Sequence, residues 1–317
     1  MYPLILKAPL KDYIWGGTRL KTEYGFESNA SKVAEAWVLS CRDDGMNVVL
    51  NGKYKGYKLC DVLDIWKEAL GSNSQGTGYF PILIKLIDAC SKLSVQVHPN
   101  DEYAHKTVGE QGKNELWYVI DCVEGSKILY GFKTKITKEE FAKRIKDNTL
   151  DDVVNYVTVN KGDVFYIPAG TLHAIGEGIL IAEIQQNSNT TYRVSDYGRL
   201  GADGKPRELH IEKAKDVTVT SPPGHPYGNI GVSREVGNAK MRELLMSDEF
   251  SSSYITLDGE LHLQNADSFI SLVVLNGTAT LSWNYEQEKL HKGSSVFIPA
   301  GISVTVCGKA CMLTTTI

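Results

Sequence analysis

The stretch that decides how this chain folds reads GDVFYIPAGTLH and covers residues 162–173. Gly162 and Gly170 mark turns, and Pro168 ends the strand expected over residues 164–167, because proline cannot donate a hydrogen bond to a sheet. His173 follows the second turn at a fixed offset. A lone histidine on an apolar strand is usually packed or solvated. The pattern Gly-x5-Pro-x-Gly-x2-His is much more restrictive and singles out His173 as a functional residue.

Two earlier segments supply further metal-capable side chains. In SVQVHP, residues 94–99, Gln96 and His98 are two positions apart and therefore lie on the same face of a strand. Glu115 stands directly before LWYVI, residues 116–120, an apolar run that predicts the next strand. One glutamine, one glutamate and two histidines form a mixed oxygen and nitrogen set, which suits zinc or a neighbouring divalent metal.

These segments resemble the two sequence motifs of the cupin superfamily. The first cupin motif normally has His-x-His followed by a glutamate, and here it is Gln96-Val97-His98 followed by Glu115. The Gln-x-His-Pro variant, Lys113 two residues before Glu115, and AEIQQNS at residues 182–188 resemble type I mannose-6-phosphate isomerases, above all the short bacterial form without a long helical insertion. Matching segments run from IWGG at 14–17 to Arg193, with a weaker echo beyond residue 277, so the resemblance covers nearly the whole chain.

An internal repeat predicts a second barrel. KGSSVFIPAGISV, residues 292–304, aligns without gaps on KGDVFYIPAGTLH, residues 161–173. The second copy has Val304 in place of His173 and lacks a Gln-x-His pair, LHL at 261–263 being the nearest segment. The expected fold is therefore mainly β, with two cupin domains, each a jelly-roll β-barrel, and with the metal in the first barrel only.

A segment rich in turn-forming residues indicates where the chain divides into domains. Residues 206–226 are rich in proline, glycine and charge, which is typical of a linker. We therefore expect a catalytic cupin domain over residues 1–230 and a degenerate C-terminal cupin domain without metal ligands over 231–317. The segment TKEE at 137–140 is a capping-box signature, and it predicts a short helical insertion at about residues 137–156.

The resemblance also implies a metal site. One zinc ion per chain would be held by His98, Glu115 and His173, with Gln96 as a weaker fourth ligand because a neutral amide oxygen is a poor zinc donor. Three strong protein ligands with an open position are typical of catalytic zinc, whereas structural zinc is usually closed by four ligands, mostly cysteines. None of the 6 cysteines is placed to join this set.

The family reaction interconverts mannose 6-phosphate and fructose 6-phosphate. Its hard step removes the proton next to the carbonyl, and zinc would act as a Lewis acid that stabilises the resulting enediolate. The sequence leaves the proton-transfer base open: Glu183 and Lys113 are candidates, as are a ligand histidine and a metal-bound water.

Further residues match family positions at the substrate. The resemblance assigns substrate binding to Lys85, Ser94 and Trp15, the last at the sugar. Lys113 and Arg193 also match positions near the substrate phosphate, and the family usually gives this arginine a catalytic role. An arginine suits pairing with a carboxylate, a phosphate or a developing oxyanion.

Composition narrows the class of protein. A formal net charge of -4 over 317 residues provides no broad basic field, which argues against nucleic acid as a partner. The cysteines form no Cys-x-x-Cys pair and fit reduced thiols in a cytoplasm. The sequence has no run of eighteen apolar residues and no signal-like start, so we expect a cytoplasmic protein without a membrane partner. The sequence does not distinguish between a monomer and a homodimer as the oligomeric state.

Two other functions are compatible with a cupin fold. An iron-dependent cupin oxygenase is one, but Gln96 replaces the histidine expected there, and Lys85, Lys113 and Arg193 offer an anion site that an oxygenase does not need. A non-catalytic sugar-binding or storage bicupin is the other, and the intact metal set argues against it. Fold alone does not decide among them.

Overall fold

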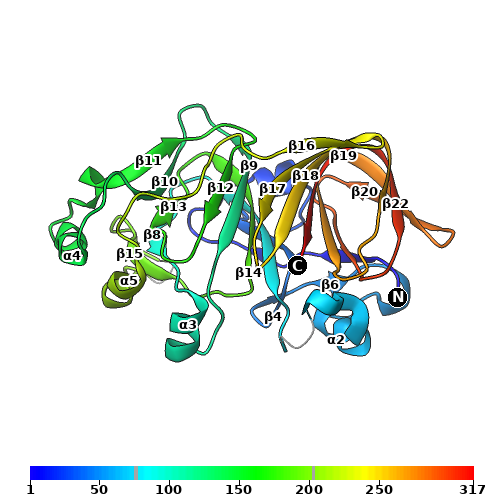
Figure 1. Cartoon of the computed structure of the whole chain (residues 1–317), viewed down its shortest axis with the longest axis horizontal. Helices are drawn as coiled ribbons and strands as arrows, with labels where there is room; N and C mark the ends of the chain where they lie inside the picture. The colour runs from blue at the N-terminus through cyan, green and yellow to red at the C-terminus, as the bar shows by residue number, and fades with distance from the viewer. Residues whose placement is uncertain (75–77, 202–203) are drawn as a thin grey trace.

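The computed structural model describes residues 1–74, 78–201 and 204–317, which form two β-rich bodies side by side (Figure 1). The first body contains a six-stranded sheet in the order β12-β9-β14-β7-β3-β2 and a five-stranded sheet in the order β11-β10-β13-β8-β15. Neighbouring strands in both sheets are antiparallel. The bounds are β2 Leu10–Lys11, β3 Glu35–Leu39, β7 Ile82–Ala89, β8 Val95–Val97, β9 Glu115–Cys122, β10 Lys127–Phe132, β11 Val154–Thr158, β12 Val164–Ile167, β13 His173–Ala174, β14 Ile179–Gln186 and β15 Tyr192–Ser195.

The second body is a nine-stranded sheet made mostly by the C-terminal third of the chain. It also takes in β1 (Leu4–Lys7), which pairs with β21, and β6 (Val48–Val49), which pairs with β1. Two strands from the predicted first domain thus complete the second sheet, and the boundary near residue 230 stays a prediction. The remaining strands are β16 Ser233–Val236, β17 Ala239–Met246, β18 Ser251–Leu263, β19 Ile270–Trp283, β20 Glu286–His291, β21 Ser295–Ile298 and β22 Val304–Thr316.

The internal repeat adopts the same local structure twice. Strand β12 of the first copy corresponds to β21 of the second, and β13 and β22 begin at the aligned positions His173 and Val304. Gly162 and Gly293 both have φ of 90°, a left-handed conformation that favours glycine, so both copies turn in the same way. Val304 is buried in the apolar core of the second body, so the position aligned with His173 carries an apolar side chain there.

The predicted helical insertion is shorter than expected. Helix α4 spans Lys138–Lys146 and begins at Thr137, whose side chain accepts a hydrogen bond from the Glu140 amide at 3.1 Å. A 3-10 turn, η4, covers Leu150–Asp152, but residues 154–156, which were predicted to be helical, open strand β11. This part of the prediction is wrong because the segment pairs with β10 as an antiparallel strand.

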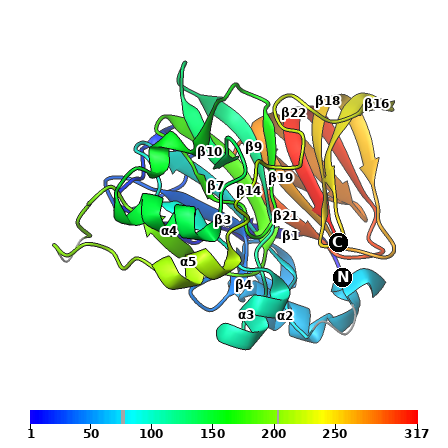
Figure 2. The same ribbon diagram turned by 60° about the vertical axis from the view of Figure 1, so that its left-hand side comes forward.

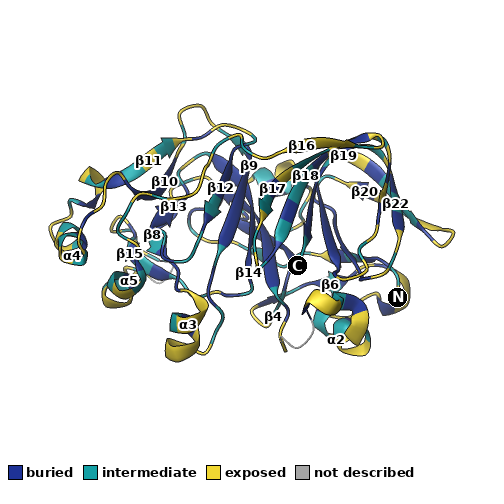
Figure 3. Ribbon diagram, in the orientation of Figure 1, coloured by how far each residue is buried: buried dark blue, intermediate teal, exposed yellow. Residues whose placement is uncertain are grey.

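Short helices and turns cover the ends and outer sides of the sheets. Helices α4 and α5 lie next to each other on the outside of the first body (Figure 2). No helix among the described residues is long and apolar enough to cross a membrane. The buried residues concentrate in the strands (Figure 3). The other elements are α1 Arg19–Thr22, α2 Leu59–Ile65, α3 Asp101–Thr107, α5 Ile211–Val217, β4 Cys41–Arg42, β5 Gly45–Met46, η1 Gly52–Tyr54, η2 Lys67–Leu70 and η3 Ser72–Ser74.

Candidate metal centre and adjoining cavity

The two sheets of the first body bring the predicted metal ligands together. His173 opens β13 and lies opposite Gln96 of the neighbouring strand β8, so both come from the five-stranded sheet. His98 directly follows β8, and Glu115 opens β9 of the six-stranded sheet. The site is therefore built between the sheets, from strand ends whose positions are set by the ladder hydrogen bonds.

The three strong candidates form one compact, buried cluster. His98 Nε2 lies 3.2 Å from Glu115 Oε1, and His173 Nε2 lies 3.7 Å from Glu115 Oε2. One potential ligand atom from each of the three residues lies within 4.8 Å of the others. The side chains of the three residues are at most 1% exposed. The three side chains are therefore already grouped as the ligands of a metal site would be.

Each histidine is oriented by a backbone carbonyl. His98 Nδ1 donates to Thr190 O at 3.0 Å, and His173 Nδ1 donates to Thr171 O at 2.9 Å. Because a carbonyl oxygen can only accept, both Nδ1 atoms carry the proton and both Nε2 atoms keep a lone pair in the neutral ring. A carbonyl partner of this kind orients a metal-ligating histidine and fixes which ring nitrogen is left to bind the metal.

Charges in the cluster suit a cation. Burial lowers the pKa of His98 to about 3 and also lowers the pKa of His173, so both imidazoles are neutral at pH 7. Burial alone would raise the pKa of Glu115, but the adjacent Lys113 ammonium outweighs it and holds that pKa well below its ordinary value. The cluster therefore presents two neutral nitrogen donors and one carboxylate.

Two more predicted residues border the cluster. Lys113 Nζ lies 2.6 Å from Glu115 Oε1 and 3.3 Å from His98 Nε2. The amide nitrogen of Gln96 lies 3.3 Å from His173 Nε2, while its oxygen accepts a hydrogen bond from Ser94 Oγ at 3.3 Å. For Gln96 to bind a metal through its oxygen, the amide would have to turn over, so its role as fourth ligand stays a prediction.

The donor set fits a divalent metal ion. Glu115 is fully buried, and neither of its carboxylate oxygens accepts a well-formed hydrogen bond from the described residues, although Lys113 lies close to one of them. A buried carboxylate normally needs such partners. Two imidazole nitrogens and a carboxylate are a common set of three protein ligands for catalytic zinc. We infer that a metal ion would supply the missing interaction, although the cluster does not identify which metal.

A cavity of about 300 Å³ adjoins the cluster and collects the residues predicted to act on substrate. Gln96 and Lys113 line this cavity and also contact the metal cluster, so they connect the two parts of the site. Three residues predicted to bind substrate and two predicted to be catalytic line it as well, namely Trp15, Lys85, Ser94, Glu183 and Arg193. The structure thus brings together residues spread over nearly 180 positions of sequence.

A buried ion pair organises one wall of the cavity. Strands β7 and β14 pair so that Lys85 lies opposite Glu183, and Lys85 Nζ donates to Glu183 Oε1 at 2.9 Å. Trp117 Nε1 donates to the other oxygen, Oε2, at 3.0 Å. Burial raises the pKa of Glu183 and the charge of Glu115 adds to this, while Lys85 opposes it. Both oxygens of Glu183 are therefore held in one orientation.

Replacing Lys85 by methionine should lower the free energy of unfolding. The change leaves Glu183 as a buried carboxylate without its cation, and breaking a buried pair in this way costs about 3–5 kcal/mol. Urea denaturation should show a lower midpoint with an unchanged slope. Lys309→Met is the control, because Lys309 and its partner Asp258 have side chains that are 83% and 72% exposed. Equal midpoint shifts in the two variants would contradict the stabilising role of the buried pair.

Arg193 lines the cavity and keeps one unpaired donor. It lies on β15 opposite Gln96, and its Nη1 donates to Glu208 O at 2.8 Å. Its buried Nε has no hydrogen-bond partner among the residues that the structure describes. An unpaired, buried guanidinium nitrogen is costly unless it serves a ligand.

Sequence analysis missed several residues of the cavity. The most informative is Arg207, which lines the cavity and binds both carboxylate oxygens of Asp196. It comes from the stretch that reads as a linker, and no spacing rule connects it to the metal motifs. Tyr13, by contrast, adjoins the aromatic and glycine turn at 14–17 and could have been found there. The others are Glu35, Ile87, Leu93, Asn189 and Thr191.

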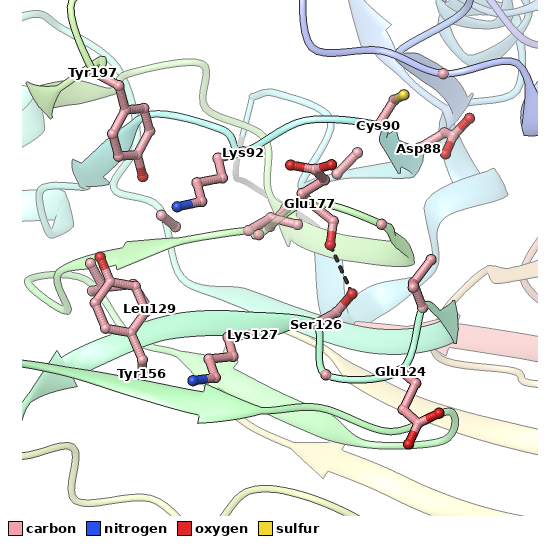
Figure 4. Close-up of a pocket in the computed structure, with 18 of the residues that line it drawn as sticks. Asp88, Cys90, Lys92, Glu124, Ser126, Lys127, Leu129, Tyr156, Glu177 and Tyr197 are labelled. Atoms are coloured by element: carbon pink, nitrogen blue, oxygen red, sulfur yellow. Dashed lines mark hydrogen bonds between the residues drawn. The ribbon is translucent and has the colours of Figure 1, made fainter.

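A larger cavity, of about 820 Å³, lies beside the site but contains none of the predicted site residues. Figure 4 shows Lys92, Lys127, Tyr156 and Tyr197 at one end of it, with acidic side chains toward the other. Lys92 and Lys127 are exposed, and the cavity does not include the histidine and glutamate cluster. We therefore place the chemistry in the smaller cavity, which adjoins the cluster, and not in the larger one.

Comparisons with known proteins identify the family of the chain. A family model for the catalytic domain of type I phosphomannose isomerase matches residues 4–121, and one for the cupin domain of mannose-6-phosphate isomerase matches residues 240–316. The chain is 37% identical over 297 residues to the mannose-6-phosphate isomerase of Streptococcus mutans, and this match covers 94% of the chain and 92% of that relative. The chain belongs to the type I mannose-6-phosphate isomerase family.

Other members of the family extend the comparison. Mannose-6-phosphate isomerase ManA of Bacillus subtilis is 37% identical over 302 residues, which covers 95% of the chain and 94% of that relative. A crystal structure of mannose 6-phosphate isomerase from Bacillus subtilis has a TM-score of 0.92 at 33% identity and covers 100% of both chains. A phosphomannose isomerase from Salmonella typhimurium, at 17% identity and a TM-score of 0.81, shows the shared fold alone. The resemblance inferred from the cupin motifs is thereby confirmed.

Proposed function

We propose that this protein is a zinc-dependent aldose-ketose isomerase that interconverts mannose 6-phosphate and fructose 6-phosphate through an enediol(ate) intermediate. The observation that carries the proposal is the buried cluster of His98, Glu115 and His173 beside a cavity lined by four basic side chains, Lys85, Lys113, Arg193 and Arg207. The cluster supports a catalytic cation, and the basic side chains support an anionic substrate. The relatives named as mannose-6-phosphate isomerases support the identity of that substrate.

The metal would contribute one part of the chemistry. Zinc held by His98, Glu115 and His173 would act as a Lewis acid that lowers the energy of negative charge on the substrate oxygens. Lys113 would support the same charge from the protein side, because its ammonium lies between the cluster and the cavity. Ser94 and Arg207 would donate hydrogen bonds to the phosphate.

We assign the proton transfer to Glu183. The reaction moves a proton between C2 and C1 of the sugar while a hydroxyl proton passes between the two oxygens. The Glu183 carboxylate lines the cavity, and burial raises its pKa, which makes it a better proton acceptor near neutral pH than an ordinary carboxylate. Lys85 and Trp117 hold its oxygens, so little reorganisation is needed. Lys113 is less suited to this role, because its side chain is engaged in an ion pair with Glu115.

The other cupin functions fit the site less well. An oxygenase has no need of the four basic side chains that line this cavity. A storage protein has no need of an oriented pair of neutral histidines around a buried carboxylate. Neither function is suggested by the relatives, which are named as isomerases.

A coupled assay tests the proposal directly. The zinc-loaded protein should form fructose 6-phosphate from mannose 6-phosphate, and mannose without the phosphate should react with a kcat/KM lower by about a hundredfold or more, because several charged hydrogen bonds of roughly 1.5–3 kcal/mol each are lost. Failure to form fructose 6-phosphate at saturating zinc would overturn the proposal. Oxygen uptake in its place would favour an oxygenase.

A further inference from the structure

Glu110 occupies an unassigned position between two loops of the site. It lies in the segment that connects helix α3 to strand β9, five residues before Glu115. Its side chain is 38% exposed, and it does not line the 300 Å³ cavity. Nothing in its sequence surroundings singles it out, because an isolated glutamate in a connection is usually a solvated charge.

The Glu110 carboxylate collects donors from three consecutive residues of a second loop. Its Oε2 accepts hydrogen bonds from Ser188 Oγ at 3.3 Å, the Asn189 backbone amide at 3.2 Å and Thr190 Oγ1 at 3.3 Å. Its Oε1 accepts one from Arg42 Nη2 at 3.4 Å. Burial alone would raise the pKa of Glu110, but the Asn189 amide and Arg42 outweigh it and lower that pKa, so the side chain is charged at pH 7.

The loop held by Glu110 leads directly to the metal cluster. Thr190, whose hydroxyl donates to Glu110, offers its own backbone carbonyl to His98 Nδ1 at 3.0 Å. That hydrogen bond sets the ring orientation in which His98 Nε2 faces Glu115. Asn189 and Thr191, on either side, line the cavity. The position of one carbonyl oxygen therefore decides whether His98 is ready to bind a metal.

Other contacts fix the start of this loop more than its centre. Asn187 is held by Pro81 O and Phe80 O, and Ser188 O accepts from Gln185 Nε2 at 2.6 Å. At residues 189 and 190, the side-chain partners outside the loop are Glu110 and, for the Asn189 side chain, Asp44 at 2.8 Å. Among the described residues, Glu110 thus holds the Thr190 hydroxyl, while the Thr190 carbonyl accepts from His98.

We propose that Glu110 is a positioning residue that orients His98 for metal binding by holding the loop of residues 188–190. The inference deepens the proposed function and rests on a metal being bound by His98, Glu115 and His173. Glu110 touches neither substrate nor metal, and acts through Thr190. Partners that orient a ligating histidine typically contribute 10–100-fold to metal affinity or activity.

The zinc affinity of the metal-free protein tests this inference without an activity measurement. Glu110→Ala should bind zinc about 10-fold more weakly than the parent in competition with a chromophoric chelator. Glu110→Gln keeps one acceptor oxygen but loses the charge, so its zinc affinity should lie between those of the parent and Glu110→Ala. This variant also keeps the test usable if the alanine variant does not fold. Glu140→Ala is the matched control, since Glu140 also pairs with an arginine, Arg144, and its side chain is 40% exposed.

The outcomes separate this inference from the proposed function. Zinc affinities of both Glu110 variants within twofold of the parent and of Glu140→Ala would overturn it. A fall in melting temperature with unchanged zinc affinity of the folded protein would also overturn it, because Glu110 would then be merely structural. Failure of the parent itself to bind zinc would contradict the proposed metal site instead, and the inference would fall with it. Recovery of kcat by Glu110→Ala at saturating zinc would support the positioning role.

Discussion

Exchanging His173 for alanine should remove zinc from the protein and lower isomerase turnover by at least about a thousandfold, while the chain stays folded. The imidazole supplies one of the three strong donors around the cluster, and its Nε2 has no substitute among the described residues near Glu115. Losing a Lewis acid removes several kcal/mol of transition-state stabilisation, and each 1.4 kcal/mol is a factor of ten in rate.

The fold should survive because the metal is not its main support. Each body buries its own extensive apolar core, and the cluster around Leu272 and Val306 in the second body lies far from the metal ligands in sequence and contains none of them. On one preparation, metal analysis measures the zinc content, circular dichroism measures folding, and the coupled assay measures isomerase turnover. A chelator applied to the parent should reproduce the effect, and added zinc should reverse it.

His262 provides the matched control for this prediction. It belongs to the second body, where its ring contacts Thr305 and Glu260 and its side chain is 72% exposed. His262→Ala should leave zinc content and turnover unchanged. Loss of zinc from this variant would mean that the metal sits in the other barrel, and an active, zinc-free His173→Ala would end the catalytic-metal proposal.

The metal cluster could be predicted because its signals are local. Strand alternation places Gln96 and His98 on one wall, and the glycine and proline turns place His173 at a fixed distance from the end of β12. The same turns recur in the second copy, so the two-barrel fold could be predicted from the repeat. Each of these motifs lies within about a dozen positions of sequence, although the motifs themselves are far apart in the chain.

The parts that sequence analysis missed depend on contacts between distant segments. Glu110 reaches the loop at 188–190 across nearly 80 positions, and Arg207 comes to the cavity from a stretch that no motif connects to the metal motifs, although its partner Asp196 is close in sequence. Strand β1 leaves the first body to pair with β21, although nothing at residues 4–7 indicates the partner. In the predicted helical insertion, pairing with β10 overrode a weak local preference beyond residue 153.

Arg193→Ala should lower kcat by about 10²–10³-fold and change KM much less, because removing one preorganised donor from a developing oxyanion has an effect of this size. The side chain of Arg193 lines the cavity, and its Nε has no partner among the described residues, so the guanidinium has donor capacity left for charge that appears only as the reaction proceeds. Zinc content should stay at the parent level, since Arg193 touches none of the three ligands through a recorded contact.

Steady-state kinetics with metal analysis distinguish this role from simple phosphate binding. If Arg193 bound only the phosphate, its loss would raise KM and leave kcat nearly unchanged, because the interaction would be equal in the ground and transition states. Arg193→Lys should recover little, since an ammonium cannot reproduce the planar set of guanidinium donors. Arg234→Ala, on the exposed strand β16, is the control. A near-normal kcat for Arg193→Ala would remove the arginine from the chemical step and leave Lys113 as the residue facing the developing charge.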